Sequence, residues 1–120
     1  MSGGHFDYED RRIRYIAEDI ERIIALNRVE RPKESLASYD YDENGNVEEW
    51  AKYHYNYPDE IIEKFKEAVI RLREAYVYAH CIDYLICDDY GEESFFEVLE
   101  EKLAELKDYK FPTKEVYLEK

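Results

Sequence analysis

Apolar residues recur at helical spacing in the first quarter of the chain. Between residues 8 and 27 they form one stripe, with Asp7 before it as a predicted N-cap and acids in the first turn. The members of the stripe are Ile13, Ile16, Ala17, Ile20, Ile23 and Ile24. This pattern predicts an amphipathic first helix over residues 8–27.

A second and longer helical pattern follows Pro58 and continues to about residue 88. Proline suits the first helical position, and acids suit the first turn. Its predicted core face comprises Ile61, Phe65, Ala68, Val69, Leu72, Tyr76, Ala79 and Ile86. At 1.5 Å per residue this helix is about 45 Å long, which exceeds the roughly 30 Å diameter of a small domain.

A third helical stripe extends over residues 92–108 and contains Phe95, Leu99, Leu103 and Leu106. Between the first two helices, residues 28–57 are rich in tyrosine and contain an Asn44–Gly45 turn signal, which predicts irregular structure or a short hairpin. A tail covers residues 109–120. We therefore expect one mainly α domain of three helices with a long central helix and a Tyr-rich insertion, spanning residues 1–120.

The second half of the long helix is apolar on nearly every side. Residues 75–87, from Ala75 to Cys87, contain a single charged residue, Asp83, although 39% of the chain is charged. A helix that is apolar all round is normally buried all round. We therefore predict a homo-oligomer assembled through this segment. The alternative is that the Tyr-rich insertion wraps it within one chain.

Composition limits the function classes. The net charge is −13, which disfavours sequence-specific binding to nucleic acid and fits a soluble acidic protein, a DNA mimic or a binder of basic partners. No apolar run approaches the roughly 20 residues that span a bilayer, so no membrane partner is expected. Cys81 and Cys87, six positions apart on one helix, are too distant for a disulfide and indicate a cytoplasmic protein.

Asp83 lies in the predicted core and needs a partner, because an unpaired buried carboxylate costs several kcal/mol. The predicted partners are Arg14, His5, His80 and the backbone amides of the Gly3–Gly4 segment. Asp83 is therefore either a structural link to the N-terminus or an acid that faces a ligand.

Aromatic, cationic and imidazole side chains could together bind a nucleotide. Rings would stack the base, arginines would neutralise phosphate, and histidines would donate hydrogen bonds. The candidate ligand-binding residues are His5, Tyr8, Arg11, Arg14, His54, Tyr57, Arg73, Asp83 and Tyr84.

Two patterns resemble metal sites. The segment Asp40 to Glu48 matches the start of an EF-hand loop, with Asp40, Asp42, Asn44 and Glu48 as calcium candidates, but Ala51 stands where the bidentate glutamate belongs. The carboxylate pairs Glu18/Glu21 and Glu60/Glu63 are typical both of all-α magnesium-dependent nucleotide hydrolases and of solvated helices. We expect no metal, no cofactor and no catalytic residue.

Several short motifs carry a resemblance. They are Gly3-Gly-His-Phe6, Trp50-Ala-Lys-Tyr-His-Tyr55, Tyr57-Pro58, Ile82-Asp-Tyr-Leu85 and Asp89-Tyr-Gly-Glu-Glu-Ser-Phe95. As a set they are similar to a family of small uncharacterised proteins of tailed phages and of prophages of gut bacteria. This chain departs from that pattern at Cys81, where the family has Arg, and at Tyr84, where it has Trp.

The resemblance implies a phage origin and the cytoplasm of an infected or lysogenic bacterial host. Small phage proteins without enzyme motifs often counter host defence. We therefore predict a non-catalytic homo-oligomer that sequesters a nucleotide-derived immune signal. The alternatives are an acidic inhibitor or DNA mimic that blocks a nucleic-acid enzyme, with its carboxylates on one continuous face of the first and third helices, and an all-α magnesium-dependent nucleotide hydrolase.

Overall fold

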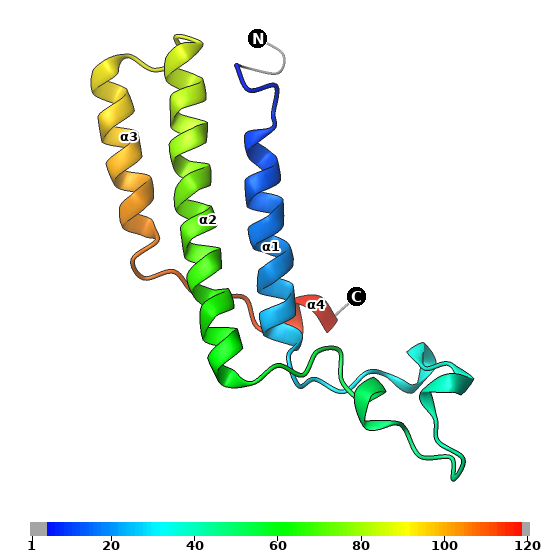
Figure 1. The fold of residues 1–120 in the computed structure, drawn as a ribbon. Coiled ribbons are helices and arrows are strands. Elements are labelled where there is room, and N and C mark those ends of the chain that lie inside the picture. The colour runs from blue at the N-terminus through cyan, green and yellow to red at the C-terminus, as the bar shows by residue number, and fades with distance from the viewer. Residues whose placement is uncertain (1–4, 119–120) are drawn as a thin grey trace.

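The computed structural model describes residues 5–118 and is built from helices (Figure 1). Three long helices run alternately up and down: α1 (Asp10–Leu26), α2 (Asp59–Ile86) and α3 (Glu92–Glu105). A short fourth helix, α4 (Glu115–Leu118), ends the described chain. The expected three-helix fold with a long central helix is therefore confirmed.

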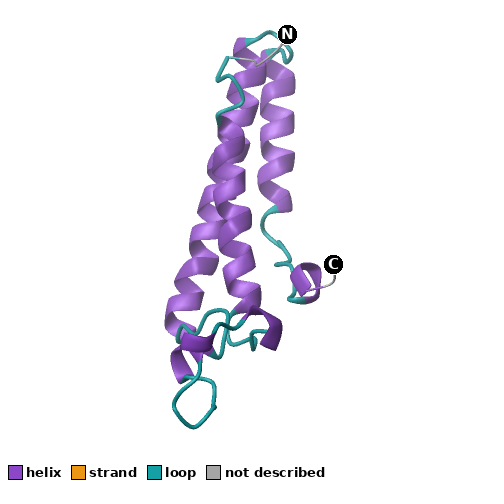
Figure 2. Ribbon diagram, turned by 90° about the vertical axis from the view of Figure 1, so that its right-hand side faces the viewer, coloured by secondary structure: helices purple, strands orange, loops and turns teal. Residues whose placement is uncertain are grey.

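The long helix α2 separates the other two long helices. α1 packs along one side of it and α3 along another (Figure 1). Viewed at 90°, α3 and the C-terminal segment both lie on the same side of the α1–α2 pair (Figure 2). The molecule is elongated, with principal extents of 67 × 30 × 22 Å. The opposite side of the α1–α2 pair therefore receives little cover from the rest of the described chain.

Helix ends follow local chemistry, with one exception. Pro58 and Gly91 occupy the N-cap positions of α2 and α3, each followed by two acids in the first turn. The predicted N-cap Asp7 is wrong: the N-cap of α1 is Glu9, without a side-chain cap bond. Asp7 and Tyr8 instead adopt left-handed backbone conformations, with φ of 54° and 66°. These two residues turn the chain into α1.

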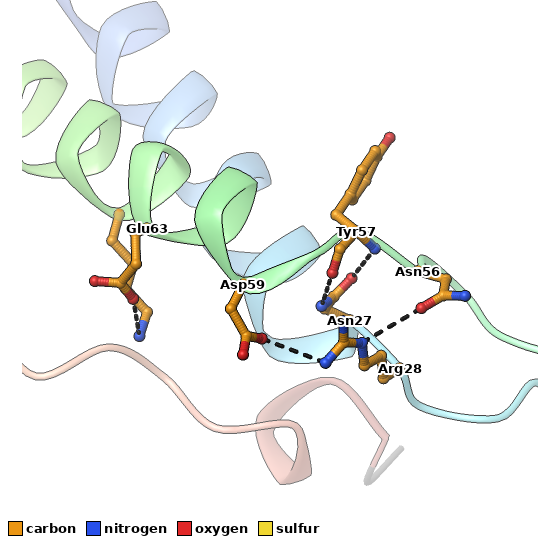
Figure 3. A network of polar contacts seen from close by, with 7 residues as sticks. Asn27, Arg28, Asn56, Tyr57, Asp59 and Glu63 are labelled. Carbon is orange, nitrogen blue, oxygen red and sulfur yellow. Dashed lines mark hydrogen bonds and ion pairs between the residues drawn. The ribbon is translucent and has the colours of Figure 1, made fainter.

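The Tyr-rich insertion forms three 3-10 turns, Lys33–Ser35, Ser38–Asp40 and Glu49–Ala51, and three isolated β-bridges. Its two ends meet where α1 stops and α2 begins (Figure 3). There the side-chain amide of Asn27 forms two hydrogen bonds with the backbone of Tyr57. Its oxygen accepts the Tyr57 N–H at 2.8 Å, and its nitrogen donates to the Tyr57 carbonyl at 3.0 Å. The insertion therefore lies at the opposite end of α2 from residues 75–87 and does not wrap them.

The core of the chain is small. The buried apolar residues are Ala17, Leu26, Ala51, Ile62, Val69 and Cys81. Among residues 5–118, four acids are also buried, namely Asp10, Glu21, Asp40 and Asp83. The predicted core stripes are wrong at Ile16, Ile61 and Ile86, which remain 53%, 41% and 49% exposed. No helix within residues 5–118 is long and apolar enough to cross a membrane.

Candidate functional site

The buried carboxylate of Asp83 ties the N-terminal segment to the end of α2. Its Oδ1 accepts the backbone N–H groups of His5 and Phe6, at 2.5 and 3.1 Å. Two amide donors satisfy the carboxylate, as burial demands. Of the two readings of Asp83, the structural link fits these contacts, and the amides involved are those of His5 and Phe6. Gly3 and Gly4, whose amides were also considered, lie outside the described residues.

A second buried acid, Glu21 of α1, accepts hydrogen bonds from two side chains. Arg73 of α2 donates to both of its carboxylate oxygens, at 2.8 and 2.9 Å. Tyr109, in the segment after α3, donates its hydroxyl to the same carboxylate. Burial and this hydrogen bond raise the pKa of Tyr109, so the phenol stays protonated. Arg73, predicted to bind phosphate, is therefore occupied by a carboxylate that joins α1, α2 and the C-terminal segment.

A third cross-link joins Asp10 of α1 to His80 of α2, with Oδ2 and Nδ1 3.3 Å apart. The His80 ring is also part of a continuous row of aromatic side chains. It lies 5.4 Å from the ring of Tyr76 and 4.4 Å from that of Tyr84, measured between centroids. Tyr90, in the turn after α2, continues the row at 5.0 Å from Tyr84. Asp10 therefore fixes the orientation of the central ring.

This aromatic row lines a cavity of about 370 Å³ between α2 and α3, here named the aromatic groove. Its lining residues are Tyr76, Val77, His80, Cys81, Tyr84, Tyr90, Val98 and Lys102. One cation, Lys102 of α3, and no carboxylate belong to this described lining. In a chain of net charge −13, such a hollow is a local exception to the overall acidity.

A second cation stands beside the groove on α1. The guanidinium carbon of Arg14 lies 5.5 Å from the centroid of the Tyr76 ring, which is cation–π distance. Its Nε is buried and has no hydrogen-bond partner among the described residues, although Glu18 lies within ion-pair range at 3.7 Å. Arg14 therefore places a positive charge beside the Tyr76 ring, on the α1 side of the groove.

The nine predicted ligand-binding residues do not form one site. Only Tyr84 lines the aromatic groove and only Arg14 borders it. Tyr8 and Arg11 are exposed at the start of α1 and contact each other, with the Arg11 guanidinium 4.3 Å from the Tyr8 ring centroid. His5 is exposed beside them in the sequence, its backbone bound to Asp83.

Two further predicted residues, His54 and Tyr57, lie in the insertion at the far end of α2. The backbone N–H of His54 donates to the backbone carbonyl of Val29 at 2.9 Å, and the Tyr57 ring packs on Phe65 at 5.5 Å between centroids. Burial, Arg22 and Arg31 together lower the pKa of His54. Because both residues lie in the insertion, at the end of α2 opposite Tyr84, a site that combines them with Tyr84 is not formed.

The candidate calcium ligands serve turn formation. The buried Asp40 carboxylate accepts the amide of Ala37 at 2.7 Å and lies 3.8 Å from Arg31. Asp42 Oδ1 accepts the amides of Asn44 and Asn46, both at 2.9 Å, and Gly45 takes a φ of 80° between them. Among residues 5–118 no cluster of three His, Cys, Asp or Glu side chains is arranged to hold a metal ion.

Three of the four carboxylates considered for magnesium have partners of their own. Glu21 is bound to Arg73, Glu18 lies 3.7 Å from Arg14, and Glu63 lies 3.3 Å from Lys66. The acids of α1 and α3 also sit on helices that α2 separates (Figure 1). The predicted continuous acidic face on these two helices stays a prediction.

Apart from Tyr84, the groove residues were not among the predicted ligand-binding residues, and Tyr90 and Lys102 are the polar ones among them that lie outside α2. Tyr90 sits in a turn, outside any periodic pattern, and burial raises the pKa of its phenol. Lys102 gave a signal that could have been used, because it is a lone basic residue near the end of a glutamate-rich helix. Burial also raises the pKa of the Cys81 thiol, which keeps this groove cysteine protonated at neutral pH.

No family model, curated protein or solved structure matches this chain.

Proposed function

We propose that the protein is a non-catalytic binding protein that sequesters a nucleotide-class ligand in the aromatic groove. The observation that carries the proposal is the groove itself: a row of four aromatic rings with Lys102 in its lining and Arg14 at its border. An aromatic surface between two cations is complementary to a flat base that carries phosphate.

The rings supply the stacking part of this recognition. The volume of about 370 Å³ lies near the lower end of the range for small-molecule sites and suits one base. The base would stack on Tyr84 or His80. Because Asp10 engages His80 through Nδ1, the other ring nitrogen, Nε2, remains for the ligand. That nitrogen accepts a hydrogen bond in the neutral ring and donates one in the protonated ring.

The cations supply the electrostatic part. Lys102 and Arg14 flank the aromatic row from α3 and α1, so a phosphate beside the stacked base would meet positive charge on both sides. The net charge of −13 opposes long polyanions, whose many phosphates extend beyond the groove. A small nucleotide with one or two phosphates avoids this repulsion, which favours a free nucleotide over DNA or RNA.

Three features favour binding without turnover. The groove cysteine is protonated, the buried acids Asp83 and Glu21 are bound to amides or to Arg73, and no carboxylate belongs to the groove lining. The described groove lining therefore offers His80 as its one candidate general base and no carboxylate that could hold a metal ion for hydrolysis. Together with the resemblance to phage proteins, this supports capture of a host nucleotide signal in the bacterial cytoplasm as the biological role.

Isothermal titration calorimetry with a panel of mononucleotides and cyclic dinucleotides tests the proposal. We expect at least one to bind and to be recovered intact by chromatography. Tyr84→Ala should weaken that binding about 5- to 150-fold, because stacking contributes roughly 1–3 kcal/mol per base. Lys102→Met and Arg14→Met should each weaken it and reduce its salt dependence.

Lys64→Met is the matched control, since Lys64 is an exposed lysine of α2 outside the groove and should leave the affinity unchanged. Absence of binding across the whole panel contradicts the proposal. Cleavage of the nucleotide in the presence of magnesium contradicts its non-catalytic part and supports the hydrolase alternative.

A further inference from the structure

Helices α1 and α2 each carry an apolar heptad series on the side away from the aromatic groove. On α1 it consists of Ile13, Ile16, Ile20 and Ile23, spaced by three, four and three residues. On α2 a first row comprises Ile61, Ala68, Ala75 and Ile82, which are spaced by seven residues. Four residues after each of these lies a member of a second row, which comprises Phe65, Leu72, Ala79 and Ile86. Such alternation of three and four is the pattern of helices that pack against other helices. We name these residues the outer face.

The outer face is not buried in the single chain. Each of its side chains is at least partly exposed, and Ile16 and Ile86 are each about half exposed. The inner series, which does pack between α1 and α2, contains the buried acids Asp10, Glu21 and Asp83. A chain that buries carboxylates while leaving a heptad row of isoleucines in water lacks a packing partner.

The pattern of side-chain sizes on the outer face indicates what that partner is. α1 presents a row of bulky isoleucines, whereas the middle of α2 presents the small residues Ala68, Ala75 and Ala79. Large side chains of one helix fill the spaces that small side chains leave on another. In an isologous arrangement the isoleucine row of each chain meets the alanine row of the other. The chain therefore contains both halves of one self-complementary surface.

The size of the outer face is sufficient. α1, at 17 residues, is about 25 Å long, and two packed helices are about 20 Å wide, which gives roughly 500 Å² per chain. Two copies would bury roughly 1,000 Å², the lower bound for a specific interface. The outer series of both helices contain no charged residue, so the net charge of the chain does not act at the centre of the contact.

We propose that the outer face is a homodimer interface, in which the α1–α2 pairs of two chains form a four-helix bundle. Both α3 helices and both aromatic grooves then lie on the outside, because α3 packs on the other side of α2 (Figure 2). The interface extends the expected contact at residues 75–87 along both helices. It does not depend on the proposed ligand, since no outer-face residue lines the groove.

Analytical ultracentrifugation over a dilution series of the full-length protein tests this interface. One chain has a mass of 14.6 kDa, and the sedimenting wild-type particle should have twice that mass. Ile16→Glu and Ala75→Glu should each shift the mass to that of the monomer, because a carboxylate would be buried at the contact. Phe96→Glu is the matched control: Phe96 is an exposed aromatic residue of α3, and this variant should remain a dimer.

Circular dichroism of each variant separates loss of the contact from loss of the helices. A wild-type protein that sediments as a monomer at every concentration overturns the proposal. So does a wild-type dimer that both outer-face variants leave intact, because its contact would then lie elsewhere. Should one variant unfold, the other and the wild-type mass still decide between these outcomes. Nucleotide binding by a monomer would leave the proposed function standing.

Discussion

Replacing Arg73 by methionine isolates the energetic role of the buried ion pair. Methionine keeps helix propensity and much of the side-chain volume but removes the charge that faces Glu21. The Glu21 side chain is only 3% exposed, and after the change it would retain a single donor, the hydroxyl of Tyr109. A buried carboxylate that loses its cation destabilises a fold by about 3–5 kcal/mol. Because the Arg73 side chain is 18% exposed, water can partly replace it. We therefore expect about 3 kcal/mol.

Urea denaturation followed by circular dichroism, at one protein concentration, measures this loss. For a chain of this length it corresponds to a melting temperature lower by roughly 10 °C. Arg71→Met is the control, because Arg71 lies on the same helix, is 82% exposed and forms a surface pair with Glu74 at 3.7 Å. It should cost less than about 0.5 kcal/mol.

A double variant, Glu21→Gln with Arg73→Met, separates the effect of the uncompensated charge from the other effects of losing Arg73. It leaves no uncompensated charge and should be less destabilised than Arg73→Met alone. Equal losses for Arg73→Met and Arg71→Met would refute the inference that Glu21 is buried against Arg73. A double variant that is less stable than either single variant would refute the charge-based explanation.

Three further changes probe the remaining contacts. Asp83→Asn weakens a charge-assisted acceptor of two N-terminal amides, so it should cost about 1–2 kcal/mol and speed hydrogen exchange of those amides, measured by mass spectrometry. Tyr109→Phe removes a hydrogen bond to the Glu21 carboxylate and should lower the free energy of unfolding by about 1.5–3 kcal/mol in urea titration, without changing the helix content. The pKa of His54 is held below its ordinary value of 6.5, so the unfolded chain binds the proton more readily. The free energy of unfolding should therefore fall as pH decreases below about 6.5, and His54→Gln should remove that part of the pH dependence.

The helices were predictable from sequence because their signals are local. The first helix was expected at residues 8–27 and observed at Asp10–Leu26, and the second was expected at 58–88 and observed at Asp59–Ile86. Proline and glycine mark the starts of α2 and α3, and apolar periodicity sets their extent. The third helix ends at Glu105, three residues before the expected end, because its last turn loosens into hydrogen-bonded turns.

The direction in which each stripe faces was not predictable. α1 carries two neighbouring heptad series, one of isoleucines and one that contains Asp10 and Glu21. Hydrophobicity favours the isoleucines as the inner series, yet Arg73 and His80 on α2 draw the two acids inward. Such pairing joins residues more than fifty positions apart, and no local pattern reveals it.

The residues of the candidate site were likewise predictable only where local signals mark them. Tyr84 lines the aromatic groove and Arg14 lies beside its Tyr76 ring, and the role of both in ligand binding stays a prediction. Arg73 had the right chemistry, but its partner Glu21 lies 52 positions away and occupies it. Tyr90 and Lys102 enter the groove only because α3 folds back along α2, which is a tertiary contact.

Native mass spectrometry of the protein, purified during phage infection from bacteria with an active nucleotide-signalling defence, reports directly whether it captures a nucleotide. We expect a polypeptide dimer that carries a noncovalent adduct with the mass and ultraviolet absorption of a nucleotide. The adduct should be released intact on denaturation and should be absent from the Tyr84→Ala variant. A polypeptide that carries no small molecule under these conditions, from wild type and variant alike, would contradict this expectation.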